Sequence, residues 1–287
     1  KKKKSRSRSS RKKLRERRKE ESAIVAEEEA LVEGNKIPTS VNDFEKAILS
    51  SPNSSIVWIK YMAFQLSMTE VDLARGIAER ALKQINYREF DEKLNVWLAY
   101  INLEYKYGDE KSFEHLFKRT IEVNDAVVVF RRVATILFEA HDPEKAHEMY
   151  KRAIKKHGSK SIPLWADYGL FAIKTKNRYV KFQDVLSQAL QRMPSRESIS
   201  IITKFALLEF KNGTPERART MFEEILANYP KRVDIWNMYL DQEISIFAQN
   251  AETTSVVGKK ATRIQKLFNR VVSLKFSSKK MKFFFKK

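Results

Sequence analysis

The sequence contains no cysteine. This excludes disulfide bonds, thiol catalysis and cysteine-ligated zinc, and it removes any argument for an oxidising compartment. Glycine and proline are scarce, with seven of each in 287 residues, which argues against collagen-like, glycine-rich or turn-dense all-β architectures. No apolar run approaches the ~20 residues of a membrane span, and the N-terminus lacks the apolar core of a signal peptide. We therefore expect no membrane association.

Motifs for catalysis and cofactor binding are also missing. The four histidines, His115, His141, His147 and His157, do not form the HExxH pattern of zinc proteases, and each is expected to be a solvated surface residue. The glycines are isolated from one another, so no glycine-rich phosphate loop can form. We predict that the chain is not an enzyme and has no catalytic, cofactor-binding or metal-binding residues, although a repeat protein could assemble a site from distant residues.

The residues that are present favour helix and a sizeable core. Hydrophobic residues make up 43% of the chain, so it is not wholly disordered even though 32% of its residues are charged. Its formal charge of +20 first suggests binding to nucleic acid or to an anionic membrane. The charge is concentrated at the two ends, since residues 1–20 and residues 258–287 each have a net charge of +11. The 237 residues between these ends are close to neutral, with a net charge of −2.

Residues 1–38 have the composition of a disordered linker. A Ser-rich basic block is followed by an acidic stretch that contains Glu27, Glu28 and Glu29, and then by Gly34 and Pro38. Such a block can be a nuclear import signal or a tether for phosphate backbones, and it can equally be a solvated linker without a specific partner. The chain begins with Lys1 and ends in an aromatic and basic run, so we expect it to be a fragment of a longer protein.

An internal repeat runs through the rest of the chain, residues 39–287. The four tryptophans mark it, and Phe130 and Ile202 fill the two wide gaps between them. The repeats then begin near residues 58, 97, 130, 165, 202 and 236, with steps in the thirties that are typical of helical repeat proteins. Four units have Tyr three residues after Trp, on the same face of a helix. These markers are Trp58, Tyr61, Trp97, Tyr100, Trp165, Tyr168, Trp236 and Tyr239.

A second helix follows each of the first five markers by about sixteen residues and the sixth marker by 28. Three apolar positions at spacings of four recur in every unit, for example Ala74, Ala78 and Leu82. In the sixth unit these positions are Ile264, Phe268 and Val272, and an insertion around Asn250 to Gly258 is predicted to be a loop. Asp142 and Thr214, each followed by Pro and Glu, are predicted N-caps. Residues 42–50 are predicted to be a lone second helix, and a further helix is predicted to begin at Ser278.

These patterns predict an all-α fold of about six helical hairpins with flanking half units. A single hairpin cannot bury both of its apolar faces, so neighbouring hairpins must stack, and we expect a right-handed superhelical solenoid. Because the Trp position recurs in every unit, its side chains are predicted to be core residues rather than ligand-binding residues.

The repeat resembles the half-a-tetratricopeptide (HAT) repeat, on the pattern Trp97, Tyr100 and Glu104 and on second helices such as AxxxAERAL at residues 74–82. The resemblance covers residues 42–276 and implies a TPR-like scaffold in a nuclear ribonucleoprotein setting. The chain departs from the HAT pattern at the expected Glu and at the expected second-helix Arg, which predicts weaker polar contacts between helices there. The positions are Gln65, Leu137 and Ala172 for Glu, and Gln188 and Glu224 for Arg, which is retained at Arg80, Arg119, Arg152 and Arg270.

A closer similarity is to the C-terminal HAT array of a family of large ribosomal-RNA-processing factors, called programmed cell death protein eleven in animals. It is carried by the runs SSPNSSIVWIKYMAFQL at residues 50–66 and EKLNVWLAYINLEYKYG at residues 92–108. The resemblance implies a non-enzymatic scaffold for ribosome biogenesis in the nucleus and nucleolus. It implies roles in pre-rRNA processing, the small-subunit processome and early large-subunit assembly, with ribosome-assembly proteins and pre-rRNA or snoRNP as partners.

Eight basic residues in the third and fourth repeats are candidates for RNA binding. Residues 151–181 have a local charge of +8, with Asp167 as their only acid. The cations fall into two turns on either side of a helix of about 18 Å, so two half-patches are expected rather than one, and both could be merely solvated surface. The candidates are Lys151, Lys155, Lys156, Lys160, Lys174, Lys176, Arg178 and Lys181.

Two alternatives remain open at this stage. One is a HAT scaffold of pre-mRNA 3′-end processing or splicing. The other is an array that itself binds RNA tightly. The acidic remainder of the array favours a protein or basic peptide partner, for which a solenoid offers an extended groove. The sequence predicts neither a monomer nor a self-associating chain.

Overall fold

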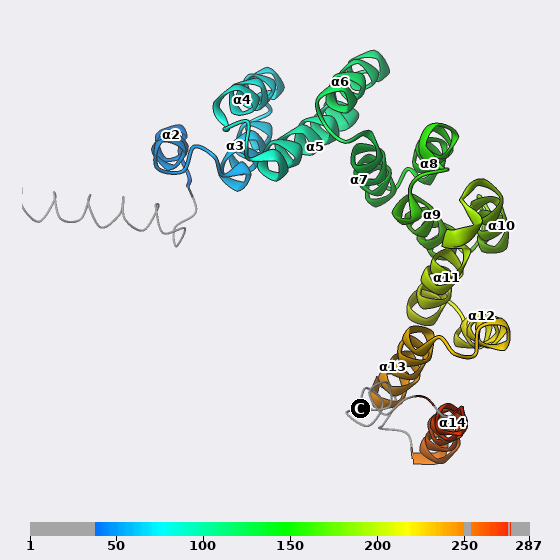
Figure 1. Cartoon of the computed structure of the whole chain (residues 1–287). Helices are drawn as coiled ribbons and strands as arrows, with labels where there is room; N and C mark the ends of the chain where they lie inside the picture. Colours follow the sequence, from blue (N-terminus) through cyan, green and yellow to red (C-terminus); the bar gives the residue numbers. More distant parts are fainter. Residues whose placement is uncertain (1–37, 250–253, 275, 277–287) are drawn as a thin grey trace, which may run out of the picture. The chain divides into compact units, whose positions relative to one another are not determined.

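The computed structural model describes residues 38–249, 254–274 and 276, with the backbone alone at residue 249 and over residues 254–262. Every regular element in these residues is a helix (Figure 1). The α-helices are α2 (Val41–Ser50), α3 (Ser55–Ser67), α4 (Val71–Gln84), α5 (Phe90–Tyr107), α6 (Glu110–Val123), α7 (Ala126–Glu139), α8 (Pro143–His157), α9 (Ile162–Lys174), α10 (Phe182–Arg192), α11 (Ser198–Asn212), α12 (Pro215–Asn228), α13 (Val233–Gln249) and α14 (Thr254–Ser273), with one 3-10 turn η1 (Ser195–Glu197).

The helices alternate as first and second members of hairpins. The marker residues lie in α3, α5, α7, α9, α11 and α13, and each of these helices is followed by its partner helix. The predicted lone second helix is α2. The all-α, helical-hairpin prediction is therefore confirmed. The chain divides into two compact units, Lys1–Val129 and Phe130–Lys287, and each is described by itself.

Local chemistry fixes where several helices begin. The Ser40 side chain accepts a hydrogen bond from the Asp43 N–H while the Asp43 carboxylate accepts from the Ser40 N–H, which forms a capping box at the start of α2. Asp142 caps α8 as predicted, because its carboxylate accepts from the Lys145 N–H at 3.1 Å. Thr214 does occupy the N-cap position of α12, but its side chain makes no capping hydrogen bond.

The tryptophan markers lie in the core and bind the turn that precedes their own helix. Trp58, Trp165 and Trp236 are fully buried. Each indole N–H donates to a backbone carbonyl six or seven residues upstream, at Pro52, Gly158 and Pro230. A buried tryptophan needs such a partner for its N–H, and the turn gains a fixed contact. At these three markers the pairing uses an N–H that Phe and Tyr rings do not have.

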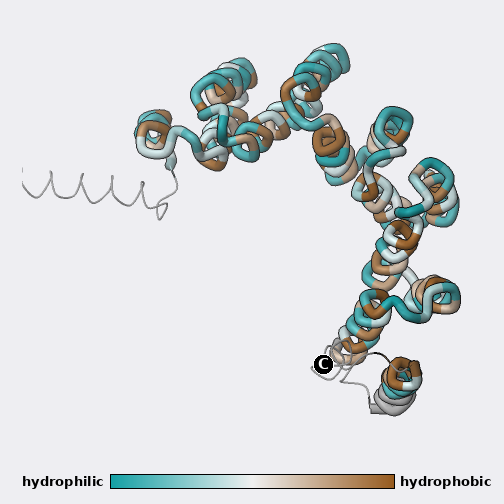
Figure 2. The backbone as a smooth tube through the Cα atoms, viewed as in Figure 1, coloured by the Kyte–Doolittle hydropathy of each residue, from teal (hydrophilic) through white to brown (hydrophobic). Residues whose placement is uncertain are grey.

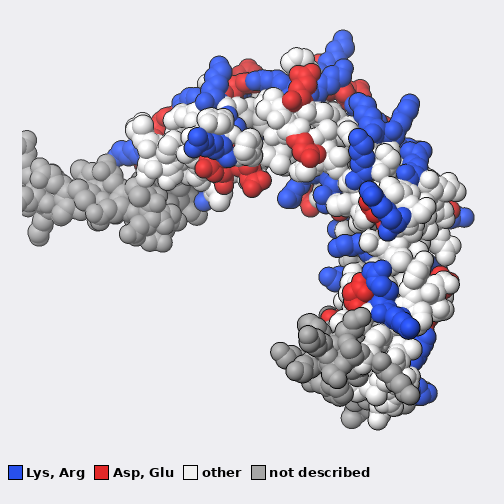
Figure 3. Space-filling view, viewed as in Figure 1, with Lys and Arg blue, Asp and Glu red and all other residues white. Residues whose placement is uncertain are grey.

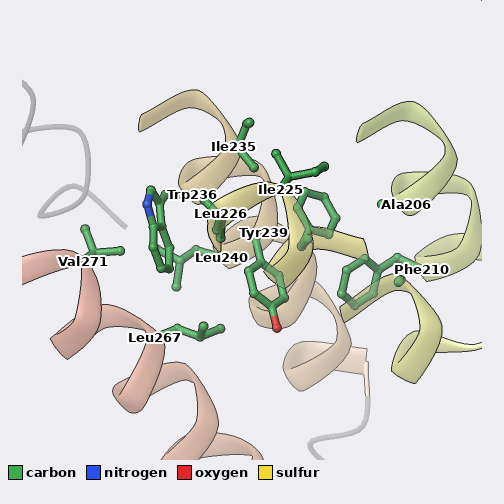
Figure 4. Packing of buried hydrophobic residues seen from close by; sticks show 12 residues of the cluster. Ala206, Phe210, Ile225, Leu226, Ile235, Trp236, Tyr239, Leu240, Leu267 and Val271 are labelled. Carbon is green, nitrogen blue, oxygen red and sulfur yellow. The ribbon is translucent and has the colours of Figure 1, made fainter. Parts of the chain in front are cut away.

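The core of the last two hairpins shows how successive units bury the marker. Trp236 lies between Leu226 of α12 and Val271 of α14, with Leu240 and Leu267 below it (Figure 4). Tyr239 stacks on Phe222 with ring centroids 5.1 Å apart. Along the chain, hydrophobic residues lie on the sides of helices that face their neighbours (Figure 2). Burial of one such tryptophan removes on the order of 200 Å² from water, which is worth about 5 kcal/mol.

Two details of the sixth unit differ from the prediction. Residues 254–258 are helical, so the predicted loop around Asn250 to Gly258 is wrong over that part; α14 runs for 20 residues. In α14 the buried residues are Leu267 and Val271, whereas Val272 is 42% exposed. The corresponding residues Leu82, Ile154 and Leu226 of earlier units are buried. Within the part of the chain that the structure describes, no helix follows α14 to cover Val272.

The linker predicted for residues 1–38 lies outside the described residues except for Pro38, and so does the helix predicted from Ser278.

Candidate nucleic-acid interface

Helix α8 carries the first group of candidate cations on the face opposite to its core stripe. The buried stripe consists of Ala146, Met149, Tyr150, Ala153 and Ile154. Lys151, Lys155 and Lys156 are exposed, and the last two belong to the final turn, where cations interact favourably with the helix dipole. Lys160 is exposed in the turn that follows.

The second group lies in the turn between α9 and α10. Lys176 and Asn177 adopt positive φ values of 51° and 58°, which non-glycine residues seldom do. Hydrogen bonds hold this conformation: the Asn177 N–H donates to the Ala172 carbonyl at 2.8 Å, and its side-chain oxygen accepts from the Phe182 N–H at 2.9 Å. The turn is thus ordered by its backbone and by Asn177, while the side chains of Lys174, Lys176, Arg178 and Lys181 remain exposed.

The two groups lie at opposite ends of α9. This helix has 13 residues, which corresponds to about 20 Å between the groups. The structure therefore brings together Lys155, Lys156 and Lys160 at one end and the four cations of residues 174–181 at the other, as the sequence geometry predicts. A strand of nucleic acid that contacted both groups would have to extend along α9.

Few carboxylates compete with these cations. Asp167, the only acid in residues 151–181, is engaged with Arg131, whose Nε donates to it at 2.5 Å. The acids of α8, Glu144 and Glu148, belong to its N-terminal half, so this helix is acidic at its start and basic at its end. In the space-filling view, Lys and Arg side chains gather over the region of α8 and α9 (Figure 3).

A recurring ion pair links the second helices of several hairpins. In three units the second-helix arginine pairs with a glutamate of the preceding second helix and lies over the tryptophan of its own unit, about 5 Å from the ring centroid. The three sets are Arg80 with Glu45 and Trp58, Arg119 with Glu79 and Trp97, and Arg270 with Glu223 and Trp236. We call this contact the arginine rung.

Between α8 and α10 the two rung positions hold Lys151 and Gln188 instead. A lysine thus replaces the carboxylate, and an amide replaces the arginine. The hydrogen bond to Arg119 lowers the pKa of Glu79 in an intact rung. The HAT resemblance located the arginines but not their glutamate partners. These partners could have been found by asking which acids recur one residue before the arginine register in the preceding unit.

A second recurring contact is buried. Seven residues after the marker, Glu104 and Glu243 are each 4% exposed and accept two hydrogen bonds from an arginine of the preceding second helix. Arg75 binds Glu104 at 2.7 and 3.0 Å, and Arg219 binds Glu243 at 2.6 and 3.1 Å. These hydrogen bonds raise the pKa of both arginines. Bidentate geometry of this kind is the strongest form of the pair.

Between α8 and α9, His147 and Ala172 occupy the same two positions. His147 is half-buried and stacks near Tyr168 and Phe171, and its Nδ1 lies 3.2 Å from the Tyr168 hydroxyl. Burial, reinforced by Lys151, lowers the pKa of His147, and burial raises the pKa of Tyr168 to about 12. The prediction of a solvated histidine is wrong here, because an uncharged aromatic contact has replaced the ion pair of other units.

The described residues contain no cluster of three or more His, Asp or Glu side chains that could hold a metal ion. Among the described helices, none combines the length and apolarity needed to cross a membrane.

The fold and the site together define a class: an all-α helical-hairpin repeat protein with exposed cations concentrated on the third and fourth hairpins. No protein-family model matches the chain. Several curated proteins are similar to the chain in sequence. The chain is 41% identical over 91% of its length to the human Protein RRP5 homolog, and 42% identical over 88% to the rRNA biogenesis protein rrp5 of Schizosaccharomyces pombe. The rRNA biogenesis protein RRP5 of Arabidopsis thaliana is 40% identical over 92% of the chain.

Over these residues the chain is a homologue of the RRP5 proteins, and it spans only 13% to 14% of their length. This agrees with the ribosomal-RNA-processing family named from the sequence. A more distant relative, the pre-mRNA-splicing factor CLF1 of Yarrowia lipolytica, is 20% identical over 73% of the chain. The solved structure of YrrB, a TPR protein, covers 66% of this chain and is itself covered to 93%, with 15% identity and a TM-score of 0.29.

Proposed function

We propose that this chain is a non-enzymatic scaffold segment in ribosome biogenesis, acting in the nucleolus during pre-rRNA processing. The observation that carries the proposal is the identity of 40% to 42%, over about nine-tenths of the chain, to proteins named for rRNA biogenesis. Tandem hairpins offer long surfaces for partners. Its partners would be ribosome-assembly proteins and, within the same particle, pre-rRNA or snoRNP.

The RNA that co-purifies with the full chain tests this proposal. Crosslinking in cells followed by sequencing should recover pre-rRNA and snoRNA. Recovery of mRNA or spliceosomal snRNA instead would favour the splicing scaffold and would contradict the proposal.

We also propose that the cations at the two ends of α9 contact the phosphates of the RNA. Support comes from the exposure of all eight candidates and from the scarcity of carboxylates around them. Two groups about 20 Å apart suit an extended single strand better than a compact ligand.

Charge reversal at Lys174, Lys176 and Arg178 tests the second group of cations. Binding of a single-stranded pre-rRNA fragment should weaken, and the slope of log K against log salt should fall by about 0.7 for each phosphate that the variant no longer neutralises. The matched control reverses Lys83, Arg88 and Lys111, which are also exposed and include the same residue types. Equal binding by both triple variants at two salt concentrations would refute the contact.

Residues 1–38 are proposed to act as a basic tether to the same RNA, alongside the array of residues 39–287. Comparing RNA affinity of the full chain with that of residues 40–287 separates the two contributions. A large loss on removal of the tail supports a scaffold with a tether, whereas an unchanged affinity supports the alternative of an array that binds RNA by itself.

A further inference from the structure

In unit 1, the compact unit Lys1–Val129, the helices α3 and α5 form an apolar groove. This groove lies far in sequence from the candidate RNA-binding residues. It has a volume of about 240 Å³ and lies between α3 and α5. Each helix contributes residues at i, i+3, i+4 and i+7, so one complete helical face of each lines the groove. The lining consists of Ile59, Met62, Ala63 and Leu66 from α3, and Ala99, Asn102, Leu103, Lys106 and Tyr107 from α5.

Helix α3 carries more apolar surface than its packing within the chain buries. Its buried stripe contains Trp58, Tyr61 and Met62. A second stripe, which includes Ile59, Ala63 and Leu66, faces the groove, and Ile56 is 62% exposed. The helix contains no acidic residue. A helix that is hydrophobic on all sides is typical of complete burial, so this second stripe suits a further partner.

Exposed apolar side chains are concentrated in the same unit. Of the eleven large hydrophobic residues that are exposed among the described residues, nine belong to unit 1. These are Val41, Leu49, Ile56, Met68, Leu73, Tyr87, Phe90, Tyr107 and Val123; unit 2 exposes Tyr229 and Val272. Three of the nine, Ile56, Phe90 and Tyr107, belong to the helices that line the groove, and Tyr107 is part of its lining. Tyr107 is 53% exposed, so part of the apolar lining of the groove is open to a partner.

The charges around the groove select the chemistry of its occupant. Lys106 is the only charged residue in the lining, and Lys60 is exposed one turn from Ala63 on α3. At the other end of α5, Asp91 is exposed. A single lining cation is too little for a phosphate backbone. The occupant must therefore be mainly apolar, with a carboxylate at the end near Lys106.

We propose that the groove binds an amphipathic helical segment of a partner protein, with apolar residues at i, i+3 or i+4 and i+7 and with Asp or Glu beside Lys106. The lining from Ile59 to Leu66 spans about 10 Å, which equals two turns of such a helix. Helix-in-groove recognition reads these spacings. The inference rests on the proposed scaffold function and specifies one surface that serves it.

Photo-crosslinking from the groove identifies the occupant. A benzophenone amino acid replaces Ala63 in the full chain, the chain is irradiated in cells, and crosslinked peptides are mapped by mass spectrometry. The proposal expects a segment of another protein with the apolar spacing and carboxylates described above. Crosslinks to RNA, to a second copy of this chain, to its own acidic residues 27–33, or to nothing would each overturn it.

A synthetic peptide of the mapped segment then tests the contacts in solution with the full chain. Ala63→Arg and Lys106→Glu should each weaken binding about tenfold or more, a range typical of interface contacts. Lys111→Glu makes the same charge change on α6, outside the groove, and should bind as the wild type does. A peptide with its carboxylates changed to lysine should bind Lys106→Glu better than it binds the wild type. Equal affinities throughout would refute the groove.

The two proposals fail separately. If the groove variants bind the peptide normally while pre-rRNA still co-purifies with the chain, the groove is wrong and the scaffold function stands. If spliceosomal RNA is recovered instead, the scaffold function is wrong whatever the groove binds.

Discussion

At the scale of single residues, Gly108 and Gly213 show a constraint that backbone angles do not reveal. They end α5 and α11 at ordinary φ values of −95° and −120°. A Cβ at either position would overlap the carboxylate of the glutamate four residues earlier, Glu104 or Glu209. Glu104 is held by Arg75, and Glu209 accepts from the Thr214 N–H at 2.9 Å. The glycines therefore make room for buried carboxylates.

Gly108→Ala is expected to destabilise the chain by about 1 to 3 kcal/mol, because it displaces a buried carboxylate from its partner. The measurement is urea denaturation of the full chain. Gly76→Ala in α4 is the control, since a Cβ there meets nothing within 4 Å, and it should stabilise by about 0.5 to 1 kcal/mol. Equal stability of Gly108→Ala and the wild type would contradict the steric account.

His147 makes stability depend on pH in a defined direction. Its folded-state pKa lies below the ordinary 6.5, so the unfolded chain binds more protons in this range. Its contribution is complete above pH 6.5 and is lost as the pH falls toward the lowered value. The wild type should therefore lose more stability between pH 7.5 and pH 5.5 than His147→Phe, which keeps an aromatic ring but cannot titrate. Parallel urea midpoints for both proteins across this window would exclude the effect.

At the scale of helices, the arginine rung is a modular contact that some hairpins keep and others lack. Its side chains are 32% to 46% exposed, so each ion pair is worth only about 0.2 to 1 kcal/mol. The contact of the arginine with the tryptophan ring adds about 0.5 to 1 kcal/mol. Between α8 and α10 the exposed cation Lys151 stands where the other rungs have the glutamate, so loss of the rung and gain of a cation involve the same position there.

Installing the missing rung tests this account. The double variant Lys151→Glu with Gln188→Arg should be more stable than the wild type by about 0.5 to 1.5 kcal/mol, because an ion pair and a cation–π contact form together. The two single variants supply the rest of a double-mutant cycle, whose coupling energy should be favourable. A coupling energy of zero would show that α8 and α10 do not approach as α4 and α6 do.

The prediction of elements from the sequence succeeded where apolar periodicity and start signals agreed. Helix α8 has Asp142, a proline at its first position and an uninterrupted apolar register, and both its presence and its cap were predicted. The prediction of a loop before α14 failed because polar residues such as Thr253 and Ser255 are typical of loops in sequence. Residues from Thr254 onward are nevertheless helical. The exposure of Val272 depends on which helix lies beside it, which its own periodicity does not encode.

At the scale of the whole chain, the two units carry different surfaces. Residues 38–129 contain 11 Lys and Arg against 14 Asp and Glu, and residues 130–249 contain 20 against 14. The exposed large hydrophobic residues show the opposite distribution, with nine in unit 1 and two in unit 2. Unit 1 therefore suits protein partners, and unit 2 suits an anionic partner.

The two surfaces should respond differently to salt. Between about 50 and 200 mM salt, RNA binding should weaken steeply because counterions are released from phosphates. Binding of an apolar peptide to the groove of unit 1 should change little, because apolar burial is not screened. Fluorescence anisotropy with each ligand on the same full chain checks both. A peptide affinity that falls as steeply as the RNA affinity would contradict this division.

The sequence by itself determined the repeat period, the hairpin composition, the positions of the markers and the concentration of cations in residues 151–181, because these depend on spacing and residue type along one chain. Only the tertiary structure decided which glutamate each arginine meets, that His147 replaces an arginine beside Tyr168, and that faces of α3 and α5 form a groove. Those features depend on side chains that lie 21 to 47 residues apart in the sequence, and the register in which two helices pack decides which side chains meet.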